Sequence, residues 1–165
     1  LRYNIRNTGS IYKCAVERTN LGHDTVANSI VGVHPEIHNY SKPSQAIKAL
    51  SLIVNRLVQK EFVSPQSIVI VSDTPYANSI LAGEERIGAF DLVFKHYKDV
   101  TGTEICFKTA EEFKGLEANI VIYLTHEFTN LPASSVDSRK DYVALTRARY
   151  YLYVLNTKCK AAVGE

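Results

Sequence analysis

The chain has 165 residues, of which 45% are hydrophobic and 22% are charged, a composition typical of one soluble globular domain. Its 19 Lys and Arg residues nearly balance 17 Asp and Glu residues, for a net charge of +2. This balance excludes a nucleic-acid binder that relies on overall basicity, so any nucleic-acid contact must be local. Because no apolar run reaches roughly 18 residues, we expect neither a membrane span nor a signal peptide.

The three cysteines, Cys14, Cys106 and Cys159, are widely spaced, with no CxxC pair and no neighbouring histidine at metal-ligand spacing. We therefore expect reduced thiols in a cytoplasmic protein and no metal site. The chain starts at Leu1 and contains no methionine, which indicates a segment of a longer protein.

A first helix is expected over residues 7–19, with Asn7 or Thr8 as its cap. Residues 21–35 are less regular and have room for a short edge strand. Neither stretch has the length or periodicity of a separate domain.

A second helix is expected over residues 44–62, where Ser44 follows Pro43 as the N-cap. It leads into a strand, "SIVIVS", at residues 67–72. The helix has apolar side chains at core-facing spacing, namely Ile47, Leu50, Val54, Leu57 and Val58.

In the second half of the chain, predicted helices and strands also alternate. We expect helices over residues 86–98 and 136–149, and strands over residues 104–108, 119–124 and 150–155. Several strands are apolar on both faces, which is typical of a parallel sheet covered on both sides. The sequence thus predicts one α/β domain with a mainly parallel sheet and a site at the carboxyl ends of its strands.

The stretch "KTAEEFKGLE" at residues 108–117 is the first candidate for chemistry. Lys114 and Glu117 flank Gly115 in a polar turn between two strands, where a ligand could approach the backbone. The alternative is an ordinary turn in which Gly115 is a left-handed cap and the charges are solvated.

Two arginines, Arg147 and Arg149, lie in the otherwise apolar run "DYVALTRARYYLYVL". On a helix, Arg147 would share a side with Val143 and not with Arg149. A rigidly held arginine is a fixed, bidentate phosphate donor. The alternative is a pair of cations that favour the helix C-terminus.

Near the amino terminus, Asn4 and Arg6 precede the first helix, which by itself indicates only a capping segment. The ordered set Asn-x-Arg, Thr-x4-Lys-Gly-Leu-Glu and Tyr-Val-Ala-Leu-Thr-Arg-Ala, however, resembles motifs IV, V and VI of the carboxyl-terminal RecA-like domain of UvrD/Rep/PcrA-type superfamily 1 DNA helicases. The resemblance runs from Leu1 to Leu155.

This resemblance implies a RecA-like three-layer sandwich over residues 1–165, the second motor domain of an ATP-dependent DNA helicase or translocase. Arg6 and Arg147 match the arginines that contact the γ-phosphate of ATP. Glu117 matches the glutamate that contacts the ribose, and Lys114 and Gly115 belong to the same motif.

The match also places Asn4 and Ile5 beside the nucleotide and Thr109 and Glu111 on the DNA-binding face. Two positions depart from the family pattern. Ile5 replaces a tyrosine that stacks on adenine, and Glu111 replaces a histidine that approaches DNA, where a carboxylate would repel phosphate. Where the best-known members carry a large accessory domain, only about 35 residues separate the strand at residues 67–72 from motif V.

No GxxxxGK[ST] loop and no acidic Mg²⁺-binding motif are present. The resemblance therefore implies that ATP and Mg²⁺ are held mainly by an amino-terminal RecA-like domain outside this chain, and that the isolated segment is inactive. The expected partners are ATP, that domain, and single-stranded or partly duplex DNA, with no membrane. A helicase-derived scaffold without ATP turnover and an unrelated α/β binding module are the alternatives.

Overall fold

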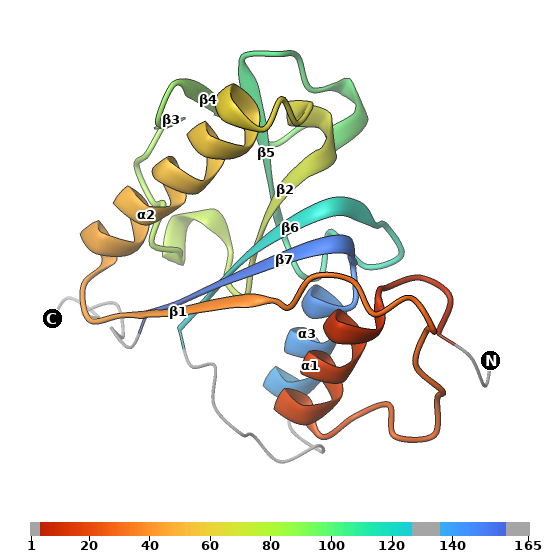
Figure 1. The fold of residues 1–165 in the computed structure, drawn as a ribbon. Coiled ribbons are helices and arrows are strands. Elements are labelled where there is room, and N and C mark those ends of the chain that lie inside the picture. The colour runs from red at the N-terminus through yellow and green to blue at the C-terminus, as the bar shows by residue number, and fades with distance from the viewer. Residues whose placement is uncertain (1–3, 127–135, 158–165) are drawn as a thin grey trace, which may run out of the picture.

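A seven-stranded sheet forms the centre of the molecule (Figure 1). The computed structural model describes residues 4–126 and 136–157. The strand order is β1-β7-β6-β2-β5-β4-β3, and every neighbouring pair is parallel except the β3–β4 hairpin. The strands are β1 Glu36–Tyr40, β2 Ile68–Ser72, β3 Arg86–Ile87, β4 Phe90–Val93, β5 Glu104–Thr109, β6 Ala118–Thr125 and β7 Ala148–Thr157.

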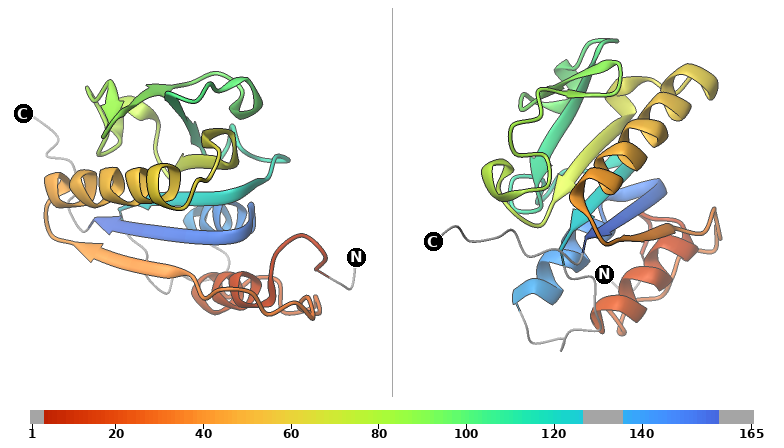
Figure 2. Two further views of the ribbon diagram at one scale, coloured as in Figure 1. Left: turned by 45° about the horizontal axis from the view of Figure 1, so that its top comes forward. Right: turned by 90° about the vertical axis from the view of Figure 1, so that its left-hand side faces the viewer.

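Helices cover both faces of this sheet (Figure 2). α1 (Gly9–Thr19) and α3 (Val136–Leu145) pack on one face, and α2 (Pro43–Asn55) packs on the other. A π-helical turn, Arg56–Lys60, extends α2, and short 3-10 turns cover Pro65–Ser67, Tyr76–Asn78 and Tyr97–Asp99. The predicted α/β fold with a mainly parallel sheet between helical layers is confirmed.

The core divides into two layers because successive strand residues point to opposite faces. On β2, Val69 and Val71 pack with α1 and α3, whereas Ile68 and Ile70 pack with α2. All of β2 is buried, as its unbroken apolar sequence predicts. The strands expected at residues 104–108, 119–124 and 150–155 are also confirmed as β5, β6 and β7, with β7 beginning earlier than expected.

The helix expected over residues 86–98 is wrong. This stretch forms the β3–β4 hairpin, in which Ile87 pairs with Phe90 and Gly88 has a φ of +60°. The residues after the two-residue turn alternate between buried and exposed: Phe90 is buried, Asp91 is exposed and Leu92 is buried. This alternation with a short turn is typical of a hairpin and outweighs the helical spacing of the apolar residues. The short edge strand sought in residues 21–35 lies immediately after them, as β1.

The predicted helix ends also need correction. α3 ends at Leu145, because Ala148 already pairs with Ala118 on β6. Lys42 and not Ser44 is the N-cap of α2, with Pro43 in the first turn, where its missing N–H costs nothing.

Thr8 is the N-cap of α1, but neither its side chain nor that of Asn7 caps the helix. Backbone carbonyls of another segment accept hydrogen bonds from the first amides of α1. Gly9 and Ser10 donate to the carbonyls of Ile30 and Val31, at 2.7 and 2.8 Å. A backbone segment thus does what the sequence assigned to a side chain.

Candidate functional site

A pocket of about 500 Å³ lies at the amino ends of β6 and β7. Glu117 directly precedes β6 and Arg147 directly precedes β7. We call it the arginine pocket; it is lined by Asn4, Ile5, Arg6, Asn7, Tyr12, Thr25, Glu117, Tyr142, Thr146, Arg147 and Arg149. The sequence predicted a site at the carboxyl ends of the strands, so for these residues the predicted edge is wrong. The turn before a strand leaves its side chains at the amino end.

One carboxylate in this pocket faces two arginines. Glu117 Oε2 lies 3.3 Å from Arg6 Nε, and Glu117 Oε1 lies 3.8 Å from Arg149 Nη1. All three side chains are about half exposed, so these ion pairs are weak and exchangeable. With Arg147 included, three guanidinium groups stand against one carboxylate, and the pocket is suited to an anion.

Arg147 lies in the turn between α3 and β7, and not on the helix face that the sequence suggested. Its Nε atom is buried and has no hydrogen-bond partner. Burial lowers the pKa of the guanidinium below its usual range, and the positive charge of Arg6 lowers it further, whereas Glu117 raises it. A buried charged donor of this kind costs free energy unless an acceptor reaches it.

The amino-terminal segment forms the opposite wall. Asn4 Oδ1 accepts from the backbone amides of Arg6 and Asn7, at 3.1 and 3.4 Å, and so closes a turn that presents Arg6. Asn4 Nδ2 is buried without a partner. Ile5 lines the pocket with 80% of its surface exposed.

Lys114 and Gly115 do not line the arginine pocket. Both are exposed in the turn before Glu117, where Gly115 has a φ of +89°. No atom lies within 4 Å of a Cβ built on Gly115. Glycine is therefore favoured at this position by the backbone conformation and not by a lack of space, as the left-handed turn interpretation predicted.

Thr109 and Glu111 lie at the other edge of the sheet, in a separate pocket of about 360 Å³ at the carboxyl ends of β2 and β5. We call it the acidic pocket; it is lined by Asp73, Pro75, Thr109, Ala110, Glu111, Glu112 and Lys140. The hydroxyl and amide of Thr109 both bond to Glu112 Oε2, at 3.1 and 2.8 Å. Glu111 Oε1 pairs with Lys140 Nζ at 3.6 Å.

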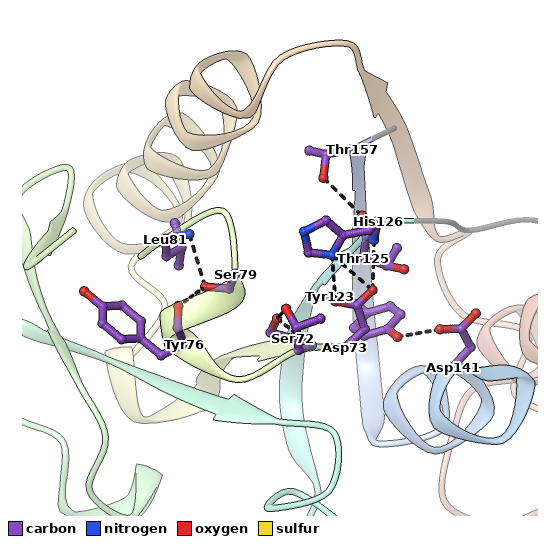
Figure 3. A network of polar contacts seen from close by, with 11 residues as sticks. Ser72, Asp73, Tyr76, Ser79, Leu81, Tyr123, Thr125, His126, Asp141 and Thr157 are labelled. Atoms are coloured by element: carbon purple, nitrogen blue, oxygen red, sulfur yellow. Dashed lines mark hydrogen bonds and ion pairs between the residues drawn. The ribbon is translucent and has the colours of Figure 1, made fainter. Parts of the chain in front are cut away.

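Two polar pairs, one partly buried and one buried, stabilise the carboxyl ends of β2 and β6, the carboxyl edge of the sheet (Figure 3). His126 Nδ1 lies 3.0 Å from Asp73 Oδ1, and the backbone amide of His126 donates to Asp73 Oδ2 at 2.9 Å. Burial alone would raise the pKa of Asp73, but the hydrogen bonds from His126 outweigh it and lower this pKa. Tyr123, fully buried in β6, donates its hydroxyl to Asp141 on α3.

Sequence reasoning missed several of these residues. Asn7, Tyr12 and Tyr142 line the arginine pocket, and Asp73 with His126 forms the carboxyl-edge pair. Asn7 follows the predicted site residues Ile5 and Arg6 in the sequence, and this position could have identified it. Only the pairing of β2 with β6 brings Asp73 to His126.

Of the predicted thiols, Cys106 is buried and free and Cys14 is half-buried and free, whereas Cys159 lies outside the described residues. Within residues 4–126 and 136–157, no group of three or more His, Cys, Asp or Glu side chains could hold a metal ion. In the same ranges no helix is long and apolar enough to cross a membrane.

Residues 22–156 match the viral superfamily 1 RNA helicase core domain. The chain belongs to this helicase family. The match contains β1 to β7, with Glu117, Arg147 and Arg149, and begins after Arg6. A nucleotide and a nucleic acid are the general ligands of a helicase domain, in agreement with a pocket suited to an anion.

Among solved structures, the fold is similar to the C-terminal domain of a possible DNA helicase from Lactobacillus plantarum WCFS1, with a TM-score of 0.63. The alignment covers 96% of this chain and 91% of that chain at 11% sequence identity. No curated protein is significantly similar in sequence.

Proposed function

We propose that the chain is the second motor domain of an ATP-dependent helicase or translocase. In this proposal the arginine pocket receives ATP held by a facing RecA-like domain of the same protein. The observation that carries the proposal is the convergence of Arg6, Arg147 and Arg149 on one pocket, in which Arg147 keeps a buried Nε without a partner.

Arg147 and Arg6 are the catalytic residues of this proposal. Phosphoryl transfer depends mainly on positioning and on stabilising charge at the transferred phosphoryl group, and an arginine from a facing domain contributes roughly 10³–10⁵ in rate. Arg147 is fixed by its buried turn, whereas the more exposed Arg6 is held by the turn at Asn4. Both would engage the γ-phosphate when the two domains close.

Glu117 and the amino-terminal segment would bind the rest of the nucleotide. Glu117 would accept from a ribose hydroxyl, exchanging its weak contacts with Arg6 and Arg149. Asn4 Nδ2 is an unused donor in the same pocket, and Ile5 offers an apolar surface to the base. Lys114 and Gly115 would act by shaping the turn that presents Glu117.

The facing domain would supply the phosphate loop and most of the Mg²⁺ coordination. This division is supported by the chemistry of the pocket, which has three cations and a single carboxylate, Glu117, among its lining residues. Mg²⁺ prefers carboxylate and phosphate oxygens and not guanidinium groups. The chain alone is therefore expected to be inactive in ATP hydrolysis.

Nucleic acid would cross the carboxyl edge, with Thr109 as a phosphate contact and Glu111 nearby. The pairing of Glu111 with Lys140 reduces the repulsion that an isolated carboxylate would exert on phosphate. We propose single-stranded or partly duplex DNA as the substrate, following the UvrD-like motifs. RNA is the second candidate, because the matching family is one of RNA helicases.

The experiment that tests the motor measures ATP turnover by the full-length protein with single-stranded DNA, and separately with single-stranded RNA. We expect Arg147→Ala to lower turnover by about 10³-fold. Arg86→Ala is the matched control, because Arg86 is an exposed arginine on the far edge strand, paired with Asp91. It should leave turnover unchanged.

Turnover that survives Arg147→Ala would contradict the assignment. Absence of turnover in the wild type would support a helicase-derived scaffold, which the exposed Ile5 at the expected adenine position also favours. The polymer that stimulates turnover more strongly identifies the nucleic acid.

A further inference from the structure

Asn7 holds the backbone around Arg147. This side chain is 2% exposed, and its Nδ2 donates to the carbonyls of Thr146, at 2.8 Å, and Ala148. These two carbonyls flank Arg147 on either side. A planar amide with two N–H donors can satisfy both acceptors from one position.

We call residues 146–149, which follow α3 and carry Arg147, the arginine turn; its carbonyls need partners from outside α3. Because α3 ends at Leu145, no amide of a following helical turn donates to the carbonyl of Thr146. Ala148 lies at an irregularity in the pairing of β6 with β7. The carbonyl of Arg147 accepts from Ala118 N at 3.1 Å, and that of Arg149 accepts from Thr8 N at 3.2 Å. Every carbonyl from residue 146 to residue 149 is thus bound by residues 7, 8 or 118.

The same residue connects the two proposed catalytic arginines. Asn7 directly follows Arg6, and its backbone amide donates to Asn4 Oδ1 in the turn that presents Arg6. Its side chain reaches the turn that carries Arg147, 139 residues later in the chain. The positions of Arg6 and Arg147 are therefore set relative to each other through Asn7.

We propose that Asn7 is a positioning residue, whose amide holds Arg147 and Arg6 in register for the γ-phosphate. This inference rests on the proposed function. Asn7 acts through the backbone of the arginine turn, because its Nδ2 is engaged by the carbonyls of Thr146 and Ala148. A misplaced arginine loses transition-state stabilisation with little change in ground-state binding.

The test compares ATP hydrolysis by the full-length protein and its variants. We expect Asn7→Ala to lower kcat at least tenfold while KM for ATP stays within about twofold. In the double variant with Arg147→Ala, the loss of turnover should be smaller than the product of the two single losses, because part of the effect of Asn7→Ala acts through Arg147. Asn7→Ser, which keeps one donor, should give an intermediate kcat.

Ser138→Ala is the matched control for loss of a buried polar contact. Ser138 Oγ donates to Thr19 O at 2.6 Å and joins α3 to α1 away from the arginine pocket. Its removal should lower the melting temperature and leave kcat unchanged. A purely structural role for Asn7 would produce that same pattern and would overturn the inference.

The outcomes separate the inference from the function on which it rests. If Arg147→Ala leaves turnover intact, the proposed function fails. If Arg147→Ala abolishes turnover but folded Asn7→Ala keeps its kcat, or if the two losses multiply, only the positioning role fails. If neither Asn7→Ala nor Asn7→Ser folds, Asn7 is a residue of stability and the inference is likewise overturned.

Discussion

The two edges of the sheet differ in how their charges are satisfied. At the amino edge, the arginine pocket gathers three cations around one carboxylate and leaves Arg147 Nε and Asn4 Nδ2 without partners. At the carboxyl edge, Asp73 and Thr109 each already have hydrogen-bond partners within the chain. The amino edge therefore keeps buried donors that a ligand could use, whereas the polar groups of the carboxyl edge are satisfied within the chain.

Removing a cation from the amino edge should have the largest effect. We expect Arg6→Ala to lower ATP turnover by the full-length protein about 10³-fold, because a charge next to the γ-phosphate is lost. Steady-state hydrolysis with saturating nucleic acid is the measurement. Retained turnover would leave Arg6 as no more than the partner of Glu117, and would weaken the contrast between the edges.

A substitution of Leu145, at the same edge, tests core packing and not the chemistry of the pocket. It is fully buried beneath the arginine turn, as its helical position predicted. Leu145→Ala should cost about 2–5 kcal/mol in the free energy of unfolding, from lost transfer energy and the cavity left behind. Urea unfolding measures this loss; a variant as stable as the wild type would contradict the burial of Leu145.

At the carboxyl edge we expect an effect of pH on stability. Because the folded pKa of Asp73 is lowered, the pair with His126 stabilises the fold fully above the ordinary aspartate pKa of about 3.9, and this stability is lost as the pH falls through the folded value. Melting temperatures of the wild type and Asp73→Asn should converge on acidification. A difference between them that stays constant down to acidic pH would show that the charge of Asp73 is not involved.

The smallest effect is expected at Glu111, whose side chain is 77% exposed. Glu111→Gln should tighten single-strand binding by no more than about fivefold, because an exposed charge contributes up to about 1 kcal/mol. Fluorescence anisotropy at two salt concentrations measures the change. Unaltered affinity would place nucleic acid away from the acidic pocket.

Local patterns were enough to predict much of this architecture. The unbroken apolar runs identified β2, β5, β6 and β7, and the spacing of Leu50 and Val54 identified the buried face of α2. Residues 86–98 were misassigned because their apolar residues fit helical spacing, while the two-residue turn at Gly88 permits a hairpin. Helix caps were misassigned where a backbone segment, such as residues 30–31, replaced the expected side chain.

The sequence by itself determined the alternation of strands and helices, and through its three motifs the arginines and the glutamate of the candidate site. It did so because hydrophobic periodicity and motif chemistry are properties of neighbouring residues. Only the tertiary structure decided that Arg6 and Arg147 share a pocket at the amino edge while Thr109 lies at the carboxyl edge. The strand order separates Thr109 from the arginine pocket, and the hydrogen bond from Asn7 to Thr146 joins the segments that carry Arg6 and Arg147. Contacts between segments so far apart in the chain cannot be predicted from the pattern of neighbouring residues.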